Sequence, residues 1–258
     1  GSTGHRTGPK GQQLIRQPNP TTEEVFVEVQ AAGLEELEMA VQGAKSAFNG
    51  WRQRSPNERA DMLYAIAHAI RQQKDTLARW ETQNIGKPAQ DAKDEIELGA
   101  RIFEYYAGAV GKYFGHTIPV SKKGLNMTLR EPMGVVAAIV PWNFPFPIAC
   151  WKVAPALAAG NTVILKPSSL SPLTALGLGK LAIEAGLPEG ILQVVPGRGR
   201  LIGEALSRHP DVRKISFTGS TQSGARIMES AAKGIKRDSL ELGGKSPDII
   251  FADADLDS

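Results

Sequence analysis

The chain has 258 residues, of which 41% are hydrophobic and 22% are charged, a balance that is ordinary for a globular protein. Its 30 Lys and Arg residues against 27 Asp and Glu residues give a net charge of +3, and no block of like charge builds the basic surface that nucleic acid requires. No apolar run reaches the roughly 18 residues of a membrane span, so we predict a soluble, cytoplasmic protein that binds neither nucleic acid nor membrane.

The first residues predict little ordered structure. Residues 1–19 begin Gly-Ser-Thr-Gly-His, with no initiator methionine and no apolar core of a signal peptide, so we predict a flexible leader. Val25, Val27 and Val29 then alternate with polar residues, which indicates a half-buried strand. Cys150 is the single cysteine, so an internal disulfide is excluded.

Residues 20–117 are predicted to be mainly helical, with apolar residues at helical spacing and no recognisable chemistry of their own. Ser55, Pro56 and Glu58 form a capping-box pattern that starts one of these helices. The three predicted apolar faces consist of Leu34, Leu37, Val41, Ala44 and Phe48, then Leu63, Ile66 and Ile70, then Ile96, Ala100, Phe103, Ala107 and Val110.

Residues 118–132 indicate a β-hairpin around a Lys-Lys-Gly turn, and from Gly134 short apolar strands alternate with helix-length segments. One of these helices is bounded by Ser171-Pro172 and by Gly186-Leu187-Pro188. We therefore predict an α/β fold with a doubly wound parallel sheet, which binds ligands at the carboxyl ends of its strands. The five predicted strands span residues 135–140, 162–165, 192–195, 214–217 and 239–242.

Two glycine-containing segments follow strands and are candidates for phosphate binding. The segment Phe-Thr-Gly-Ser-Thr at 217–221 leaves a strand and enters a helix, so the free N–H groups of that helix face the ligand region. The alternative is an ordinary N-cap formed by Ser220 or Thr221. The segment Gly-Arg-Gly at 197–199 is a weaker signal, because most glycine pairs of this kind form turns.

Three further segments place polar side chains after strands. Lys166 ends one strand, where it either points into the ligand crevice or is a solvated surface lysine. Glu241 precedes two glycines and is either a general base or a surface carboxylate. Asn143 follows Pro141 and Trp142 in a rigid, proline-rich loop, where its amide suits a developing oxyanion; the alternative is a stiff loop whose Trp142 fills the core.

These segments, in this order and at these spacings, resemble the aldehyde dehydrogenase superfamily. The matching runs are Gly-Val-Val-Ala-Ala-Ile-Val-Pro-Trp-Asn-Phe-Pro from residue 134, Asn-Thr-Val-Ile-Leu-Lys-Pro-Ser from 161, Phe-Thr-Gly-Ser-Thr from 217 and Glu-Leu-Gly-Gly-Lys-Ser-Pro from 241. The resemblance extends over about residues 20–257, and it includes Thr-Gln-Asn-Ile-Gly-Lys-Pro from 82 in the helical part.

The resemblance implies a division of the chain into parts. Residues 133–244 would form a dinucleotide-binding domain to which the helical residues 20–117 belong, and residues 245–258 would begin a catalytic domain. The hairpin at 118–132 would be part of an oligomerisation element, as in a homo-oligomer. NAD or NADP is the implied cofactor, a small aldehyde is the implied substrate, and no metal site is expected.

The resemblance also implies roles for individual residues. Asn143 matches the donor to the oxyanion, and Glu241 matches the general base that activates water. Lys166 matches the residue that reaches the adenosine ribose, and Ser220 matches the residue at the pyrophosphate. The other implied cofactor residues are Pro141 and Trp142 beside the nicotinamide, Gly197 near the adenine, Gly243 beside the base, and Ile139, Gly219 and Ser169.

Two departures from the family pattern shape what we expect. Ser169 stands where the family usually has a glutamate that binds the ribose hydroxyls, so a 2′-phosphate is not repelled and NADP should be tolerated. The family's nucleophilic cysteine lies further beyond Glu241 than Ser258, and Cys150 is expected to be a buried core residue instead. We therefore expect the N-terminal half of a dehydrogenase, truncated and inactive alone. The alternatives are a non-catalytic nucleotide-binding or assembly protein, or an enzyme completed by a separate chain.

Overall fold

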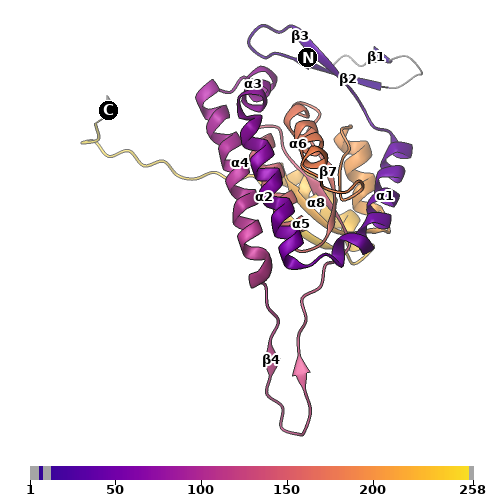
Figure 1. Ribbon diagram of the computed structural model, residues 1–258. Coiled ribbons are helices and arrows are strands. Elements are labelled where there is room, and N and C mark those ends of the chain that lie inside the picture. The colour runs from indigo at the N-terminus through magenta and orange to yellow at the C-terminus, as the bar shows by residue number, and fades with distance from the viewer. Residues whose placement is uncertain (1–5, 8–12, 256–258) are drawn as a thin grey trace.

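The computed structural model describes residues 6–7 and 13–255, and it begins with a small antiparallel sheet of order β1-β2-β3 (Figure 1). These strands are β1 (Arg6–Thr7), β2 (Gln13–Pro18) and β3 (Val25–Gln30), so the strand predicted at Val25 is confirmed. The predicted flexible leader is wrong for β2, because Ile15 and Gln17 are buried there. Residues 1–5 and 8–12 of the predicted leader lie outside the described residues.

Four helices follow, α1 (Leu34–Arg52), α2 (Pro56–Gln72), α3 (Lys74–Ile85) and α4 (Ala89–Ala109). The predicted capping box of α2 is confirmed: Ser55 Oγ accepts from the Glu58 N–H, and the Glu58 carboxylate accepts from the Ser55 N–H at 2.8 Å. The sequence pattern does not predict α3, because two of its four buried residues are the polar Glu81 and Asn84.

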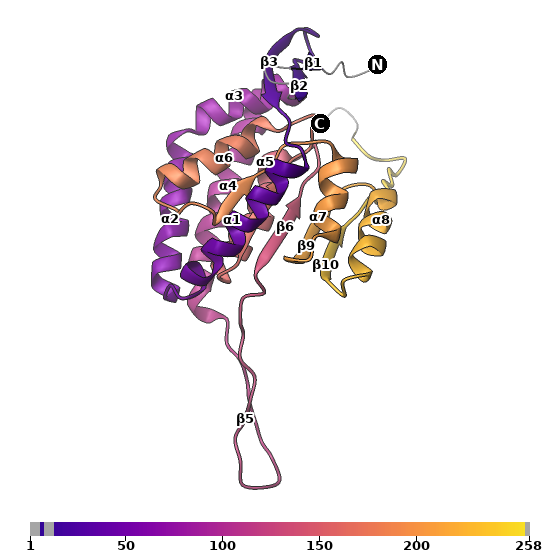
Figure 2. The same cartoon turned by 90° about the vertical axis from the view of Figure 1, so that its right-hand side faces the viewer.

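The predicted β-hairpin is confirmed as a long arm that projects from the body of the molecule (Figures 1 and 2). After the short 3-10 helix η1 (Val110–Lys112), the arm contains two short antiparallel strands, β4 (Thr117–Ile118) and β5 (Asn126–Met127). Its large apolar side chains are exposed, among them Leu125 and Leu129. An exposed apolar arm of this kind is typical of a surface that binds another protein chain.

The centre of the molecule is a five-stranded sheet of order β10-β9-β6-β7-β8, and every adjacent pair in it is parallel. The predicted α/β fold with a parallel sheet is thereby confirmed. The chain order reverses at β6, since β7 and β8 lie on one side of it and β9 and β10 on the other. The strands are β6 (Val135–Ile139), β7 (Thr162–Lys166), β8 (Leu192–Val194), β9 (Val212–Thr218) and β10 (Arg237–Glu241).

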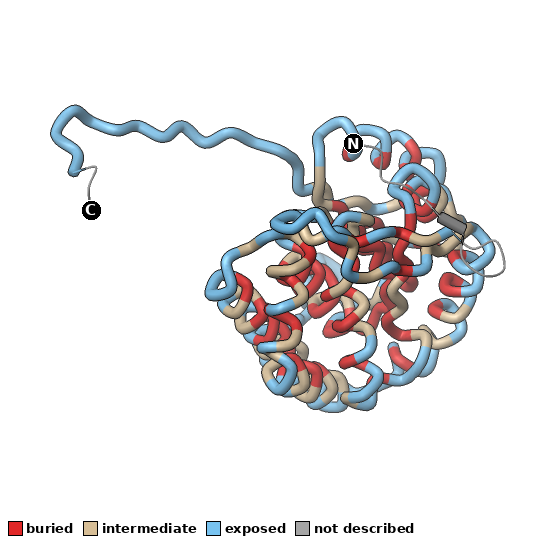
Figure 3. The backbone as a smooth tube through the Cα atoms, turned by 90° about the horizontal axis from the view of Figure 1, so that it is seen from above, coloured by how far each residue is buried: buried red, intermediate tan, exposed pale blue. Residues whose placement is uncertain are grey.

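Helices cover both faces of this sheet, as a doubly wound fold requires (Figure 2). Neighbouring residues of β6 point to opposite faces, so Ala137 and Ala138 belong to different apolar clusters. The cluster on one face includes residues of α2 to α6, and the cluster on the other face includes residues of α1, α7 and α8. Buried residues accordingly fill the interior of the molecule (Figure 3). The remaining helices are α5 (Pro145–Ala158), α6 (Leu173–Glu184), the π-helix η2 (Gly199–Gly203), α7 (Glu204–Arg208) and α8 (Thr221–Ala232).

Residues 242–255, which follow β10, are exposed and extend away from the domain (Figures 1 and 3). Across the described residues, none of the helices combines the length and the apolar character needed to cross a bilayer.

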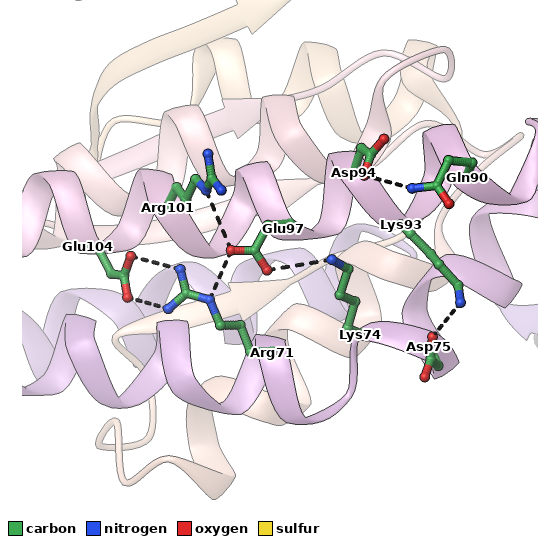
Figure 4. Close-up of polar contacts among 9 residues, drawn as sticks. All are labelled: Arg71, Lys74, Asp75, Gln90, Lys93, Asp94, Glu97, Arg101 and Glu104. Carbon is green, nitrogen blue, oxygen red and sulfur yellow. Dashed lines mark hydrogen bonds and ion pairs between the residues drawn. The ribbon is translucent and has the colours of Figure 1, made fainter.

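A series of ion pairs joins α2 to α4 along their outer sides (Figure 4). The guanidinium group of Arg71 binds Glu104 through two nitrogens and Glu97 through Nε at 3.0 Å. The hydrogen bonds from Arg71 lower the pKa of Glu104. Lys74 and Arg101 also approach Glu97, at 3.7 Å and 3.5 Å. These pairs bridge α4 to α2 and α3, and the first turn of α4 lies beside the loop that follows β6.

Glu81, on α3, is a buried carboxylate with an incomplete set of partners. Its Oε1 accepts a hydrogen bond from the Thr174 hydroxyl at 2.6 Å, whereas its Oε2 is buried with no hydrogen-bond partner among the described residues. Burial raises the pKa of Glu81 to about 7, against the opposing effect of the Thr174 hydrogen bond. The folded chain therefore retains a proton on this carboxyl at a pH where the unfolded chain has released it.

We predict that the unmodified chain loses folding stability as the pH rises, and that the Glu81→Gln variant does not show this loss. Because the pKa is raised in the folded state, the protonated carboxyl stabilises the fold fully below the ordinary value of 4.5, and this contribution is lost as the pH rises through about 7. At about 1.36 kcal/mol per pKa unit, the wild-type chain should lose roughly 3 kcal/mol more than the variant over this range. Urea unfolding near the two ends of the range measures the difference, and parallel pH profiles for the two chains would contradict the prediction.

Candidate active site

The carboxyl ends of the parallel strands open onto one large cavity. Its volume is about 800 Å³, and residues at the ends of β6 and β9, where the strand order reverses, line it. This is the position at which doubly wound folds bind nucleotides. Nine of the eleven predicted site residues line the cavity, namely Ile139, Pro141, Trp142, Asn143, Lys166, Gly219, Ser220, Glu241 and Gly243.

Asn143 lies in the loop that joins β6 to α5. The next residue, Phe144, precedes α5 and accepts a hydrogen bond from the Ile148 N–H at 3.2 Å, so the loop is tied to the first turn of the helix. Trp142 is 54% exposed, so the alternative in which it fills the core is wrong. Asn143 itself is exposed and borders the cavity, which places its side-chain amide within reach of a ligand there.

Lys166, the last residue of β7, is buried and not solvated, so the alternative of a surface lysine is wrong. Only 4% of the residue is exposed, although it lines the cavity. Desolvation lowers the pKa of its ammonium group to about 8. A Cβ built on Gly199 would lie 4.0 Å from Lys166 Nζ, so the segment after β8 passes directly beside the ammonium group.

Ser169 and Gly197 are the two predicted cofactor residues that do not line the cavity. The Ser169 hydroxyl donates to the Gly197 carbonyl at 2.9 Å, which joins the segment after β7 to the segment after β8. A Cβ at Gly197 would lie 2.6 Å from Ile202 Cγ1 and 3.1 Å from the Ala32 carbonyl oxygen, so packing within the chain already requires glycine there. A contact of either residue with a cofactor stays a prediction.

Helix α8 begins at the edge of the cavity. Ser220 is its N-cap, and the Ser220 hydroxyl oxygen accepts from the Ser223 N–H at 3.2 Å, so the ordinary N-cap is present. A Cβ at Gly219 would lie 2.5 Å from the Phe217 ring, so a larger residue at this turn would have to displace that ring. Because Gly219 and Ser220 also line the cavity, the positive end of the α8 dipole faces it, as an anion site requires.

Glu241 ends β10 and lies beside the start of α8. Its backbone carbonyl accepts from the Gly219 N–H at 3.1 Å, and its exposed side chain lines the cavity. A Cβ at Gly243 would meet only Thr221 Oγ1, at 3.9 Å, so nothing in the described chain crowds this glycine. Asn143 and Glu241 therefore border one cavity from different strands, one after β6 and the other at the end of β10.

Lys152 is a polar group near this site that the sequence motifs did not identify. It lies on α5, it is buried, and its Nζ donates to Ser216 Oγ of β9 at 3.1 Å. Desolvation lowers its pKa to about 8, while the negative charge of Glu241 opposes the shift. The available signal in the sequence is a single charge within the apolar run Ile-Ala-Cys-Trp-Lys-Val-Ala at 148–154. An ammonium group is thus buried within electrostatic range of the predicted general base.

The arrangement provides three kinds of chemistry in one cavity. The start of α8 and Lys166 provide positive potential for a phosphate-bearing ligand. Asn143 provides a neutral hydrogen-bond donor, and Glu241 provides a carboxylate that can accept a proton.

Comparisons with known proteins agree with this geometry. A family model described as the aldehyde dehydrogenase family matches residues 7–258. The chain is 47% identical to 4-trimethylaminobutyraldehyde dehydrogenase of Sus scrofa, in a match that covers 92% of the chain and 48% of that protein. It is 46% identical to the putative aldehyde dehydrogenase DhaS of Bacillus subtilis (strain 168), with coverage of 93% and 49%. The chain thus spans about half the length of the curated relatives it matches.

Solved structures match over nearly the whole described chain. An aldehyde dehydrogenase from Brucella melitensis biovar abortus 2308 superimposes with a TM-score of 0.93 at 42% identity, covering 98% of this chain and 52% of the other. The NAD+ complex of an aldehyde dehydrogenase from Bacillus cereus superimposes with a TM-score of 0.91 at 45% identity, covering 94% and 50%. On this evidence the chain belongs to the aldehyde dehydrogenase family, whose members use NAD or NADP.

Proposed function

We propose that this chain supplies the dinucleotide site, the oxyanion donor and the general base of an enzyme that oxidises an aldehyde to a carboxylic acid with NAD or NADP. The observation that carries the proposal is the single cavity at the strand ends, which gathers Asn143, Glu241, Lys166 and the start of α8. Membership of the aldehyde dehydrogenase family supports the reaction class.

The residues present fit a dinucleotide. The α8 N-terminus, with glycine at 219, would give a pyrophosphate close access to backbone N–H groups, and Lys166, which lies beside Gly199, would reach the ribose. Pro141 and Trp142 would form the wall beside the nicotinamide. Bound there, the dinucleotide would take up the hydride that leaves the substrate carbon.

The chain's own polar groups then act on the substrate. The Asn143 amide would donate to the aldehyde oxygen as that oxygen gains negative charge during attack by the family's cysteine thiolate. Glu241 would remove a proton from the water molecule that releases the acid. The test is NADH formation by a chain that carries residues 1–258 followed by the cysteine-bearing half of a relative. Failure to form NADH with any aldehyde of a broad panel would refute the assignment.

A second candidate function is that of a non-catalytic nucleotide-binding or assembly protein, and the observation that favours it is the exposed arm. The exposed apolar arm around β4 and β5 supports assembly, and we propose that it contacts other subunits in a homo-oligomer. Nucleotide binding without turnover by every longer form of the chain would favour this function.

We predict that the site discriminates against NADP+ by less than about tenfold, or 1.4 kcal/mol. Ser169 places no carboxylate near Lys166, and the segment after β8 adds the positively charged residue Arg200 to the cavity lining. Calorimetric titration of the chain with NAD+ and NADP+ measures the ratio. The ratio should shift toward NAD+ above about pH 8, because the Lys166 pKa of about 8 means that its charge is lost there.

The matched variant for this test is Ser169→Glu. It should weaken NADP+ binding at least about tenfold through repulsion between the new carboxylate and the 2′-phosphate, and it should affect NAD+ much less. A hundredfold preference of the unmodified chain for NAD+ would show that the serine does not relax cofactor choice.

A further inference from the structure

The segment Gly86-Lys87-Pro88 joins α3 to α4. None of its residues lines the cavity described above. Gly86 ends α3 with φ at 76°, and a Cβ there would lie 3.0 Å from Pro20 Cγ, so both conformation and space require glycine. Pro88 is the N-cap residue of α4. Lys87 is thereby held at a rigid corner, and its side chain is only 12% exposed.

The ammonium group of Lys87 binds three partners from two other parts of the chain. Both oxygens of the Glu95 carboxylate lie 2.5 Å from Nζ, and this carboxylate is itself 12% exposed. The backbone carbonyl of Asn143 accepts from the same Nζ at 3.1 Å. The Phe144 ring lies 4.2 Å from Nζ, within the range of a cation–π contact.

These contacts link α4 to the residue predicted to act on the substrate. The hydrogen bond uses the Asn143 carbonyl, so the side-chain amide of Asn143 remains free to donate. The other backbone anchors flank this residue: the Val140 N–H donates to the Lys166 carbonyl at 3.1 Å, and the Ile148 N–H donates to the Phe144 carbonyl at 3.2 Å. Lys87 therefore supplies the anchor at Asn143 itself.

We propose that Lys87, oriented by Glu95, is a positioning residue that fixes the backbone of Asn143 and so aims its amide at the substrate oxygen. An oxyanion donor contributes only when its geometry is set before the reaction, and a displacement of about 1 Å costs roughly a hundredfold in rate. The catalytic consequence rests on the proposed function, whereas the effect on the loop does not.

The first experiment measures backbone mobility in the 258-residue chain, without substrate or cofactor. In Lys87→Met, ¹⁵N relaxation should show the order parameters of the Trp142, Asn143 and Phe144 amides falling from about 0.85 toward 0.6. The control is Lys93→Met, the same substitution in the helix that follows Lys87, which removes an exposed 2.9 Å pair with Asp75 and should leave the three amides unchanged. If Lys87→Met does not fold, Glu95→Gln provides the same test, because it removes the carboxylate that orients the Lys87 ammonium group. Unchanged mobility of these amides in a folded variant overturns the proposal.

The second experiment measures catalysis in the chain joined to the cysteine-bearing half of a relative. Lys87→Met should slow the NADH burst about ten- to hundredfold with little change in the affinity for NAD+, and Lys87→Arg should restore part of the rate because it keeps a charged donor. A mobile loop with an unchanged burst would refute the positioning role. Absence of a burst from the unmodified chain would instead refute the proposed function, and the relaxation result would stand independently.

Discussion

In a protein that joins residues 1–258 to the cysteine-bearing half of a relative, Glu241→Gln is expected to leave the first NADH burst largely intact and to stop continued turnover. Glu241 borders the cavity from the end of β10, and its carboxylate is exposed there to water. Hydride leaves the substrate before water is needed, so removal of the base should slow only the release of the acid. The variant keeps the size and shape of the side chain, and therefore isolates the loss of the proton acceptor.

Asn143→Ala provides the opposite pattern in the same assay. Loss of the amide removes a donor to the oxygen that gains charge during the first step, so the burst itself should slow by about 10² to 10³, or roughly 2.7–4 kcal/mol. Single-turnover measurements with excess enzyme separate the burst from the later release. If Glu241→Gln abolished the burst, or Asn143→Ala slowed only the release, the two roles would have to be reassigned.

The central sheet could be predicted from the sequence because its strands are short, most of them are apolar, and helix-length segments separate them. All five predicted strands form, and they form one parallel sheet. The motifs that follow the strands could be placed near one another for the same reason, since parallel strands carry their carboxyl ends to one edge. Nine of the predicted site residues accordingly line one cavity.

Contacts between distant parts of the chain could not be predicted in this way. The strand β2 lacks a clear alternating pattern, and it is fixed through Gln17, whose side chain bonds to Ser169 and to Asn84. The placement of Lys87 against Asn143 joins residues 56 positions apart, and no local pattern encodes such a pair. The sequence also did not identify Lys152, because its contact with Ser216 of β9 and its proximity to Glu241 of β10 arise from the fold and not from a motif.

The properties of Cys150 carry the last prediction, which concerns the 258-residue chain itself. Cys150 is the single cysteine of the chain, and it is fully buried in α5. Burial raises the pKa of its thiol well above the ordinary value, and the nearby carboxylate of Glu81 raises it further. A thiol that is both inaccessible and protonated is a poor nucleophile, so Cys150 is expected to be a core residue.

We therefore predict that the 258-residue chain forms no NADH from any aldehyde, although it retains the residues that line the dinucleotide cavity. Alkylation of Cys150 by iodoacetamide should be slower in the folded chain than in urea by roughly a thousandfold or more, because the thiol is exposed only in molecules that open. A Cys150→Ser variant is the matched control, and it should bind NAD+ as the unmodified chain does. Turnover that disappears on alkylation or in Cys150→Ser would show that this thiol reaches the substrate, and the assignment of the site to the cavity bordered by Asn143 and Glu241 would then fail.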